Sequence, residues 1–365
     1  MKKIIGVPQR YIQGPGILEE IGSLVRPWGT RAVVYWDSFV KSLLEENVVS
    51  ALQNAGIEVS SVLFPGEATQ NARKLLAEEA KGKDMILAFG GGKTLDTAKG
   101  ACLDADTAMI SCPTIASTDS PASACAVWYD EEGNYEGFEM MPFNPNAVIV
   151  DTEVLVNAPV KTFTAGMGDA LATWVEAETV RRSRTLNFLG GHCTEAALAW
   201  AKLSFDILME YGLDAQRDVK NHLVTPAVEK VTEANILLSG IGFESVGLAS
   251  AHDIGNFLSN YHECHAKGMM HGHKVAFGLL AQLCLDENAA PDFRRKVLDF
   301  LVAAGLPVTL EELGFPSPTP EQFYPLADFC AAKGSLSSSH SFPLSRRKVL
   351  DAIFAADALG KEALK

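Results

Sequence analysis

The sequence has no long hydrophobic run and no closely paired cysteines. No window approaches the ~20 uninterrupted apolar residues that a membrane-spanning helix needs, and the apolar stretch within residues 1–8 ends too soon for a signal peptide. The seven cysteines include no C-x-x-C pair, which argues against a structural zinc knuckle and against a disulfide framework. These absences predict a cytoplasmic protein whose reduced thiols mostly fill small spaces in the core.

Positive charge is also scarce. The 31 lysines and arginines are outnumbered by 45 aspartates and glutamates, so the formal net charge at pH 7 is −14. Such a surface repels nucleic-acid backbones and anionic membranes, and neither is an expected partner. A hydrophobic content of 47% is ordinary for a globular protein, and 365 residues exceed a typical single domain. Two domains with separate cores are therefore expected.

The two commonest phosphate-binding glycine signatures are missing, but a related pattern is present. Residues 90–99 read GGGKTLDTAK and follow the apolar run 85–89. A strand that stops at glycines and opens into a helix lets backbone N–H groups approach an anion closely, and the helix N-terminus favours negative charge. The pattern indicates a pyrophosphate site, with an ordinary strand-to-helix turn as the alternative.

Hydrophobic periodicity divides the chain near residue 160. The first 150 residues alternate short apolar runs with amphipathic stretches, the pattern of a parallel, doubly wound sheet. Strands are predicted at 31–36, 59–64, 85–89, 108–112 and 147–151, with helices at 40–55 and 71–81. After Pro159 the period becomes helical, and helices are predicted at 167–182, 187–211, 226–260, 273–286, 292–304 and 346–359. We expect an α/β domain in residues 1–160 and an all-helical domain in residues 161–365.

Two polar segments follow predicted strands, at the edge where open α/β sheets bind ligands. Asp37 comes directly after the strand 33–36. An acid there accepts hydrogen bonds from a ribose hydroxyl and repels a 2′-phosphate, so it favours NAD over NADP; a helix N-cap is its alternative role. Residues 113–121 place hydroxyls and one carboxylate after the strand 108–112. Because they lie beside the glycine loop, we expect them to bind ligand rather than to form a plain turn.

Three side chains that can bind a metal stand in small-residue helical segments of the second half. Asp169 lies in AGMGDAL, where Gly166 and Gly168 would cost helix stability unless they allow a close approach. His252 lies in a second such helix, and His271 begins a third. One carboxylate and two imidazoles can hold a divalent metal while leaving positions open for substrate. Spacing alone leaves three competing ligands, namely His262, His265 and His273.

The chain resembles the glycerol dehydrogenases, a family within the metal-dependent polyol and alcohol dehydrogenase superfamily that also contains the iron-containing alcohol dehydrogenases. The resemblance runs almost from end to end, and an especially close segment is GMGDALATWVEA at 166–177. The other matching segments are 10–16, 90–99, 113–119, 144–145, 150–153, 247–252, 271–278 and 341–344.

The resemblance implies a Rossmann-like α/β domain with a parallel sheet at the N-terminus and an all-α domain at the C-terminus, the dehydroquinate synthase-like fold, with the active site in the cleft. It implies that Asp169, His252 and His271 hold the metal, Zn²⁺ as a rule and Fe²⁺ in some relatives. Asp119 matches a carboxylate near the bound polyol, and with His252 it is expected to act in catalysis. Contacts to NAD are implied for Asp37, Gly91, Gly92, Lys93, Asp96, Thr114, Ser117, Ser123, Cys125 and Tyr129.

The implied reaction is NAD-dependent, metal-assisted oxidation of a small polyol or vicinal diol, of the glycerol to dihydroxyacetone type, and the reverse carbonyl reduction. The metal would lower the pKa of the substrate hydroxyl and stabilise the developing alkoxide, while NAD takes the hydride. No side chain is an obvious proton relay, and Asp119, His273 and a water chain are the candidates. The resemblance also implies a homo-oligomer, with an octamer as one form.

Three positions depart from the family pattern. Gly255 stands where a second histidine is usual, His273 where a glutamate is usual, and Cys125 where an aliphatic residue is common. We expect Gly255 to open space beside the metal and to alter substrate choice. The alternatives are a dehydrogenase of the same fold that acts on a hydroxy acid or a glycerol phosphate, and a catalytically silent NAD- or metal-binding protein. No convincing basic cluster for a substrate phosphate lies near the ligand segments.

Overall fold

The computed structural model describes residues 2–365, which form two compact units. The first, which we call the sheet unit, comprises Gly6–Phe163 and Arg217–Gly240. The second, the helical unit, comprises Thr164–Gln216 and Ile241–Lys365 together with the N-terminal residues up to Ile5.

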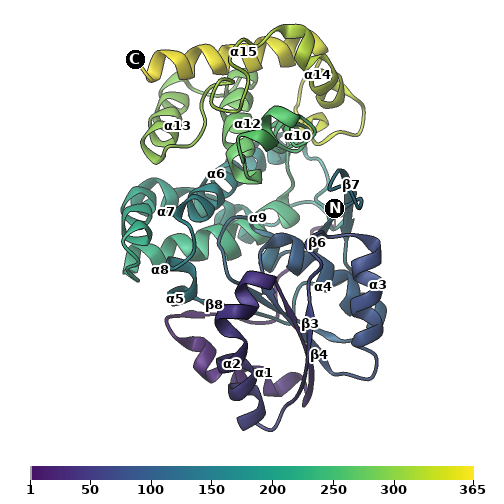
Figure 1. Cartoon of the computed structure of the whole chain (residues 1–365). Coiled ribbons are helices and arrows are strands. Elements are labelled where there is room, and N and C mark those ends of the chain that lie inside the picture. The colour runs from purple at the N-terminus through teal and green to yellow at the C-terminus, as the bar shows by residue number, and fades with distance from the viewer. Residues whose placement is uncertain (1) are drawn as a thin grey trace. The chain divides into compact units, whose positions relative to one another are not determined.

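A parallel sheet forms the centre of the sheet unit, and two of its labelled strands, β3 and β4, can be followed in Figure 1. Its six strands are in the order β1-β8-β5-β4-β2-β3. Its inner strands are apolar runs buried on both faces, as expected where helices cover each side. The parallel sheet predicted from the alternating pattern is therefore confirmed. The strands are β1 (Tyr11–Gly14), β2 (Arg31–Trp36), β3 (Glu58–Leu63), β4 (Met85–Gly90), β5 (Ala108–Pro113) and β8 (Ala147–Asp151).

Helices cover both faces of this sheet. Successive strand residues point to opposite faces, and because both sets are apolar, each face needs helices to bury it. Val34 and its neighbours on one face pack with α1 and α2, whereas Val33 and its neighbours on the other face pack with α3 and α4. The helices of this unit are α1 (Ile21–Val25), α2 (Ser38–Asn54), α3 (Gln70–Glu79), α4 (Gly92–Ala105), α5 (Thr152–Val156) and α8 (Pro226–Glu233).

The direction of the connections reverses between β2 and β4. From β2 the chain passes to the outer strand β3, whereas from β4 it passes to β5 on the opposite side. Open α/β sheets bind ligands outside the carboxyl ends of their strands at such a switch point. The segments that follow these two strands are Asp37 and the glycine run 90–92, and the Asp37 amide donates to the carbonyl of Phe89 at 2.9 Å. Two segments predicted to bind the cofactor are thus neighbours.

An antiparallel hairpin, β6 (Cys125–Tyr129) and β7 (Tyr135–Met140), was not indicated by the periodicity. Arg73 on α3 contacts both strands: its guanidinium lies over the ring of Trp128 at 5.4 Å from the ring centroid and pairs with Glu139 at 2.7 Å. A hairpin of such short strands has too few alternating residues to stand out in the sequence.

One stretch of the predicted helical domain belongs instead to the sheet unit. Within Arg217–Gly240, the carboxylate of Glu229 accepts hydrogen bonds from the Gln13 amide and from the Thr152 hydroxyl, at 2.6 Å for the latter. The division after residue 163 lies close to the predicted boundary at 160, but a single boundary does not describe this return of the chain. Polar contacts between distant segments leave no periodic signal, so the sequence did not reveal it.

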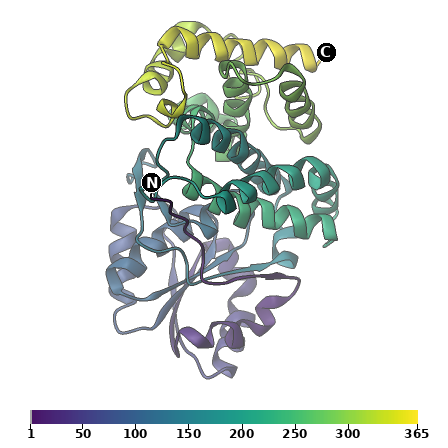
Figure 2. The same cartoon turned by 180° about the vertical axis from the view of Figure 1, so that it is seen from behind.

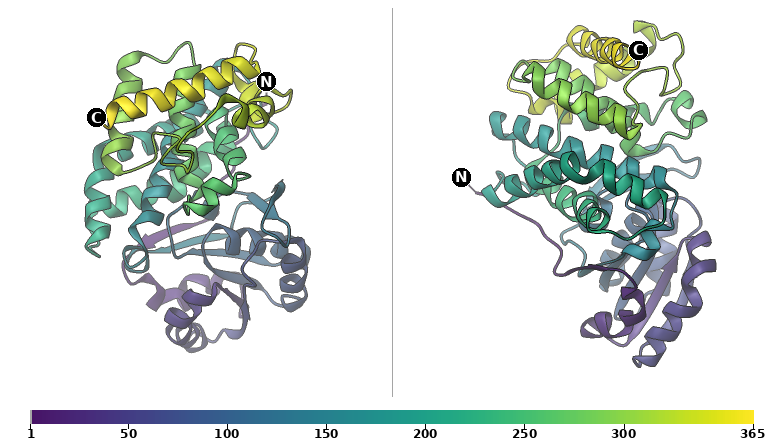
Figure 3. Two further views of the ribbon diagram at one scale, coloured as in Figure 1. Left: turned by 45° about the horizontal axis from the view of Figure 1, so that its top comes forward. Right: turned by 90° about the vertical axis from the view of Figure 1, so that its left-hand side faces the viewer.

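Helix α12 (His271–Leu285) is almost entirely buried in the helical unit. Helix α15, drawn in yellow in Figure 1, Figure 2 and Figure 3, packs on α12, α13 and α14. The long helix predicted at 226–260 is broken into α8, a π-helical turn, α9 and α10. The remaining helices are α6 (Val160–Ser183), α7 (Glu195–Lys220), α9 (Ser239–Val246), α10 (Ser250–Leu258), α11 (His262–Ala266), α13 (Pro291–Ala304), α14 (Tyr324–Ala331) and α15 (Arg346–Ala363).

All seven cysteines are free, and four of them are buried. Burial raises the pKa of the Cys102 thiol to about 12 and that of Cys264 to about 11, so both stay protonated at neutral pH and pack as small apolar groups. Within residues 2–365, no single helix has both the length and the apolar composition to cross a membrane. By those two criteria alone, one bent pair passes, Pro226–Val246 with Ser250–Leu258.

Candidate metal centre and cofactor loop

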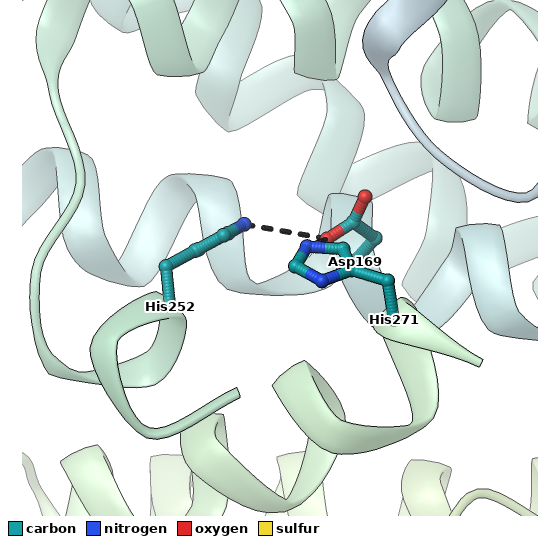
Figure 4. A group of neighbouring side chains, drawn as sticks. All are labelled: Asp169, His252 and His271. Carbon is teal, nitrogen blue, oxygen red and sulfur yellow. Dashed lines mark ion pairs between the residues drawn. The ribbon is translucent and has the colours of Figure 1, made fainter. Parts of the chain in front are cut away.

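The structure brings together the three side chains predicted to hold a metal. Asp169 comes from α6, His252 from α10 and His271 from the first turn of α12, and both imidazoles point toward the carboxylate (Figure 4). Nε2 of each histidine lies 3.3 Å from Oδ1 of Asp169. In the part of the chain that the structure describes, this is the one group of three or more ligand-type side chains whose donor atoms all lie within 4.8 Å of one another.

The donor set fits a divalent cation. Asp169 is 1% exposed, and neither of its oxygens accepts a geometrically sound hydrogen bond from residues 2–365. A buried carboxylate without hydrogen bonds is costly unless a cation compensates it. One oxygen and two nitrogen ligands leave coordination positions for substrate. The orphaned carboxylate and the two imidazoles aimed at it are therefore the arrangement that a catalytic metal requires.

The electrostatics around Asp169 and His252 favour the charged form of each. Burial by itself raises the pKa of Asp169, but the imidazoles of His271 and His252 outweigh burial and hold that pKa well below its usual range. Burial lowers the pKa of His252, but the carboxylates of Glu176 and Asp169 outweigh it and raise that pKa above the usual value. The site thus favours a positive charge next to Asp169.

Two glycines allow the ligand-bearing helices α6 and α12 to touch. A Cβ atom at Gly272 would lie 1.8 Å from the carbonyl oxygen of Ala165, and one at Gly168 would lie 2.6 Å from the carbonyl oxygen of Gly272. Neither position has room for a side chain. The close approach expected of Gly168 is therefore confirmed, and it places Asp169 beside His271.

The expectation for Gly255 is wrong in its physical premise. A Cβ atom at Gly255 would lie 2.7 Å from Cγ2 of Val275 and 3.0 Å from its Cα. The glycine thus lets α10 pack closely against α12, and its missing side chain leaves no open space beside the metal ligands. The sequence could not reveal this direction, because it depends on how the two helices pack.

Sequence reasoning missed Glu176, which contacts His252 directly. It is fully buried, and its Oε2 lies 2.5 Å from Nδ1 of the imidazole. Its other oxygen accepts the backbone amides of Ala249 at 2.8 Å and of His252 at 3.0 Å. The available signal was an acid two helical turns after Asp169 in an otherwise small and apolar helix.

The competing histidines have other roles. Nδ1 of His273 accepts the backbone amide of Met270 at 3.1 Å, and Nε2 of His265 lies 2.6 Å from the carbonyl oxygen of Ser259. Neither His262, His265 nor His273 belongs to the cluster of described ligand atoms. Geometry therefore separates His252 and His271 from the others, where spacing could not.

The glycine loop begins α4 without a side-chain cap. Gly91 is the N-cap residue, and Gly92 is the first residue of the helix. A Cβ atom at Gly91 would lie 2.9 Å from Cδ1 of Ile115, so the neighbouring segment packs close to this backbone. The N–H groups of the first turn are the groups that bind a phosphate at a helix N-terminus.

Asp37 uses one of its two oxygens. Oδ1 accepts the backbone amides of Phe39 at 3.0 Å and Val40 at 3.3 Å, so the residue caps α2. Oδ2 accepts no hydrogen bond from the described residues. The N-cap role is thus present, and an oxygen is left for the predicted ribose contact.

Two lysines of the loop have carboxylate partners. Nζ of Lys93 lies 2.5 Å from Glu67 and 4.3 Å from the ring centroid of Tyr129. Lys99 is buried, and its Nζ contacts Asp96 at 2.9 Å, the Ser120 carbonyl at 2.7 Å and the carbonyl of Cys125, the first residue of β6. Sequence reasoning assigned no role to Lys99, which holds the segments of several predicted cofactor residues together.

Asp96 is fully engaged inside the protein. Oδ1 accepts from Lys99 and from the Ser120 hydroxyl at 2.7 Å, and Oδ2 accepts the amide of Val127 at 3.1 Å. This geometry assigns Asp96 to the support of the hairpin. A direct contact to the cofactor stays a prediction.

The polar loop 113–123 lies after β5. The Thr114 amide donates to the Gly90 carbonyl at 3.1 Å, which joins this loop to the glycine run. Thr114 also lines a cavity of about 820 Å³ with residues of α2 and α5, whereas the other predicted cofactor residues do not. Ser117 and Ser123 are buried, and Asp119 accepts a hydrogen bond from the Ser239 hydroxyl at 2.9 Å.

Comparison with known proteins places this geometry in a family. The family model of the iron-containing alcohol dehydrogenases matches residues 8–152. A glycerol dehydrogenase of Escherichia coli O6:H1 is 41% identical over 100% of this chain and 99% of its own, and a glycolaldehyde reductase of Halobacterium salinarum is 37% identical over 99% of both. The crystal structure of glycerol dehydrogenase from Schizosaccharomyces pombe has a TM-score of 0.95 at 35% identity, over 99% of this chain and 92% of that one.

Identity of this level along the whole chain, with the same fold, is not found between unrelated proteins. The chain therefore belongs to the iron-containing alcohol dehydrogenase family and is an oxidoreductase that acts on CH–OH groups.

Proposed function

We propose that this chain catalyses NAD-dependent, metal-assisted oxidation of small polyols or vicinal diols, and the reverse reduction of the carbonyl. The observation that carries the proposal is the buried Asp169 carboxylate, which accepts no hydrogen bond from residues 2–365 and faces two imidazoles at 3.3 Å. The glycerol dehydrogenase and the glycolaldehyde reductase that match along their full length support this substrate class.

Asp169, His252 and His271 are proposed to hold the cation, with zinc as the first choice and iron as the alternative. When bound, a divalent cation polarises the substrate oxygen and lowers the pKa of a hydroxyl. The side chain of His271 is 33% exposed whereas that of Asp169 is 1% exposed. Exchange of substrate therefore occurs on the His271 side of the ligand group.

The cofactor is proposed to bind at the switch point between β2 and β4. The first turn of α4 would hold the pyrophosphate and Oδ2 of Asp37 would accept a ribose hydroxyl; the chemistry that NAD would supply when bound is hydride acceptance. Lys93 exchanges part of its contact with Glu67 for a phosphate oxygen. The remaining proposed contacts are Gly91, Gly92, Asp96, Thr114, Ser117, Ser123, Cys125 and Tyr129.

Asp119 is proposed to accept a hydrogen bond from a substrate hydroxyl. The Ser239 hydroxyl donates to its Oδ2. A carboxylate oxygen that also accepts a second substrate hydroxyl would make diols better substrates than monohydric alcohols. A hydroxyaldehyde such as glycolaldehyde presents the same pair of oxygens, which makes its reduction the second candidate activity.

A substrate panel with a metal-free control tests the proposal. The chain is stripped with a chelator, reloaded with zinc or iron, and assayed with NAD and glycerol, 1,2-propanediol, ethylene glycol or 1-propanol. Glycolaldehyde and dihydroxyacetone are assayed with NADH. We expect turnover only with metal, and higher kcat/KM for the vicinal diols than for 1-propanol. Activity confined to hydroxy acids or glycerol phosphate, or no turnover with metal and NAD, would contradict it.

We further propose that the protein is a cytoplasmic homo-oligomer. The basis is the family resemblance together with the acidic composition and the cysteine pattern. Light scattering of the purified full-length chain measures the oligomeric state, and a single-chain mass would contradict it.

A further inference from the structure

We propose that Glu176 is a positioning residue of the metal site, which determines the nitrogen that His252 presents to the cation and balances part of the cation's charge. This inference rests on the proposed function, because it presupposes that Asp169, His252 and His271 bind a divalent metal. Glu176 itself is not a ligand and is not a member of the ligand group.

The two oxygens of Glu176 have separate partners. Oε2 lies 2.5 Å from Nδ1 of His252, on the side of the ring opposite to Asp169. Oε1 accepts the amides of Ala249 and His252, and Ala249, the N-cap residue of α10, provides no side-chain cap of its own. One buried carboxylate from α6 therefore anchors both the start of α10 and its imidazole.

The contact at Nδ1 determines the tautomer of His252. A carboxylate can only accept, so Nδ1 carries the proton whenever the ring is neutral. Nε2, 3.3 Å from Oδ1 of Asp169, then keeps its lone pair for a cation. Partners of this kind fix ring orientation and raise the basicity of the ligating nitrogen in metal sites.

Charge gives Glu176 a second effect on metal binding. Glu176 and Asp169 are 0% and 1% exposed and together contribute two negative charges. A divalent cation with two neutral imidazoles and both carboxylates forms a neutral buried group, whereas with Asp169 alone it would keep a net charge of +1. Uncompensated buried charge is costly, so Glu176 strengthens retention of the metal without touching it.

Glu176→Gln changes which nitrogen of His252 carries the proton while it keeps the shape of the side chain at position 176. Two backbone N–H groups hold the oxygen at the Oε1 position, so the amide oxygen of glutamine takes that place and its NH₂ group faces Nδ1. His252 must then accept at Nδ1 and carry its proton on Nε2, where it blocks the cation. The substitution also removes one negative charge, and it leaves the volume almost unchanged.

Gln282 on α12 provides a matched control for a purely structural role. It is also fully buried, and its Oε1 accepts the amide of Ala251 at 2.7 Å, in the same first turn of α10. Its amide nitrogen lies 3.3 Å from the Thr179 hydroxyl, so its hydrogen bonds among the described residues go to Ala251 and Thr179 and not to the imidazole of His252. Gln282→Met removes this anchor of α10 at similar volume, so a helix-anchoring role of Glu176 would be reproduced by this variant.

The experiment measures the Zn²⁺ dissociation constant of the metal-stripped, full-length chain by competition with a chromophoric chelator. We expect Glu176→Gln to raise the constant about 10- to 100-fold, and Gln282→Met to leave it nearly unchanged. NAD binding, measured in parallel by fluorescence, is expected to be the same in all three proteins. In the zinc-loaded parent labelled with ¹⁵N-histidine, we expect His252 to carry a proton on Nδ1 and the metal on Nε2.

The outcomes distinguish this inference from the proposed function. If the parent binds zinc, and Glu176→Gln binds it as tightly as the parent or no more weakly than Gln282→Met does, the proposed role of Glu176 is overturned but the proposed function is not. Zinc on Nδ1 of His252 in the parent does the same and needs no variant, so the inference is decided even if Glu176→Gln fails to fold. A parent that binds neither zinc nor another divalent cation overturns the proposed function as well.

Discussion

At the scale of single residues, Asp37 shows how one carboxylate can serve two purposes. Oδ1 caps α2 through the amides of Phe39 and Val40, and Oδ2 accepts nothing among the described residues. The N-cap and the ribose contact were alternatives in the sequence, but they need different oxygens. A substitution can therefore remove the charge and keep the cap.

Asp37→Ser is expected to narrow the preference for NAD over NADP while leaving stability almost unchanged. Serine still caps the helix but does not repel a 2′-phosphate. Asp37→Ala is the control, because it also removes the cap and should lower the free energy of unfolding by about 1 kcal/mol. The ratio of kcat/KM for the two cofactors and urea unfolding measure these effects. Equal use of both cofactors by the unmutated chain would show that Asp37 is only a cap.

The two histidine ligands are expected to differ in their cost to the fold. His252→Ala leaves two buried carboxylates without their shared partner, so we expect loss of the metal and a loss of stability of about 3 kcal/mol. The His271 side chain is one-third exposed, so His271→Ala should lose the metal at a stability cost of less than about 1 kcal/mol. Metal analysis and urea unfolding of both variants are the measurements. Undiminished zinc content or turnover in His252→Ala would refute the ligand assignment.

At the scale of elements, close packing between helices places the proposed metal ligands. The approach of α6 and α12 depends on Gly168 and Gly272, and the approach of α10 and α12 depends on Gly255. In each case the glycine lies next to a ligand or one helical turn from it. A side chain there would separate the helices, and it would move a ligand with them.

Gly255→Ala is expected to destabilise the protein by about 1–3 kcal/mol, because the added methyl meets Val275 on α12. The sign is informative, since the same change in an exposed helix interior stabilises by about 1 kcal/mol. Gly255→His should cost more stability and shift α10, so we expect lower stability and weaker metal binding in that variant. Thermal unfolding with and without zinc measures both. A more stable Gly255→Ala variant would contradict the packing seen here.

At the scale of the whole molecule, stability depends on pH through His340. Burial lowers the pKa of this imidazole to about 4, with Arg182 acting in the same direction and Asp286 and Glu176 opposing. Its Nε2 lies 2.9 Å from the Ser250 hydroxyl. The unfolded chain binds the proton more tightly than the folded one, so stability is lost as the pH falls from about 6.5 toward 4.

His340→Gln is expected to flatten this part of the pH profile. The amide keeps a partner for Ser250 but does not titrate, so the variant should not share a loss that reaches at most about 3 kcal/mol near pH 4. Urea unfolding between pH 7 and pH 4 gives the free energy of unfolding of parent and variant. In the difference between the two, the contributions of the other titrating groups cancel. Parallel curves for the two proteins would mean that His340 is not held neutral by burial.

Much of the fold was readable from the sequence. Apolar runs separated by helical periods predicted the parallel sheet, because a strand buried on both faces has to be apolar throughout. The resemblance named Asp169, His252 and His271, and the structure brings them together. The hairpin after residue 124 and the return of Arg217–Gly240 to the sheet unit were not readable, because short strands and distant polar contacts carry no period.

The sequence by itself determined which strands are apolar enough to be buried and which side chains are chemically able to bind a metal, because local periodicity and residue type decide both. Only the tertiary structure decided which partner each buried group meets. It packed the backbone of Gly255 against Val275 and placed Glu176 against Nδ1 of His252. It also gave both oxygens of Asp96 hydrogen-bond donors inside the protein. The physical reason is that the residue pattern of a helix or strand shows which of its sides faces the core. The atom that a buried side chain contacts belongs to a distant segment, whose position follows from packing alone.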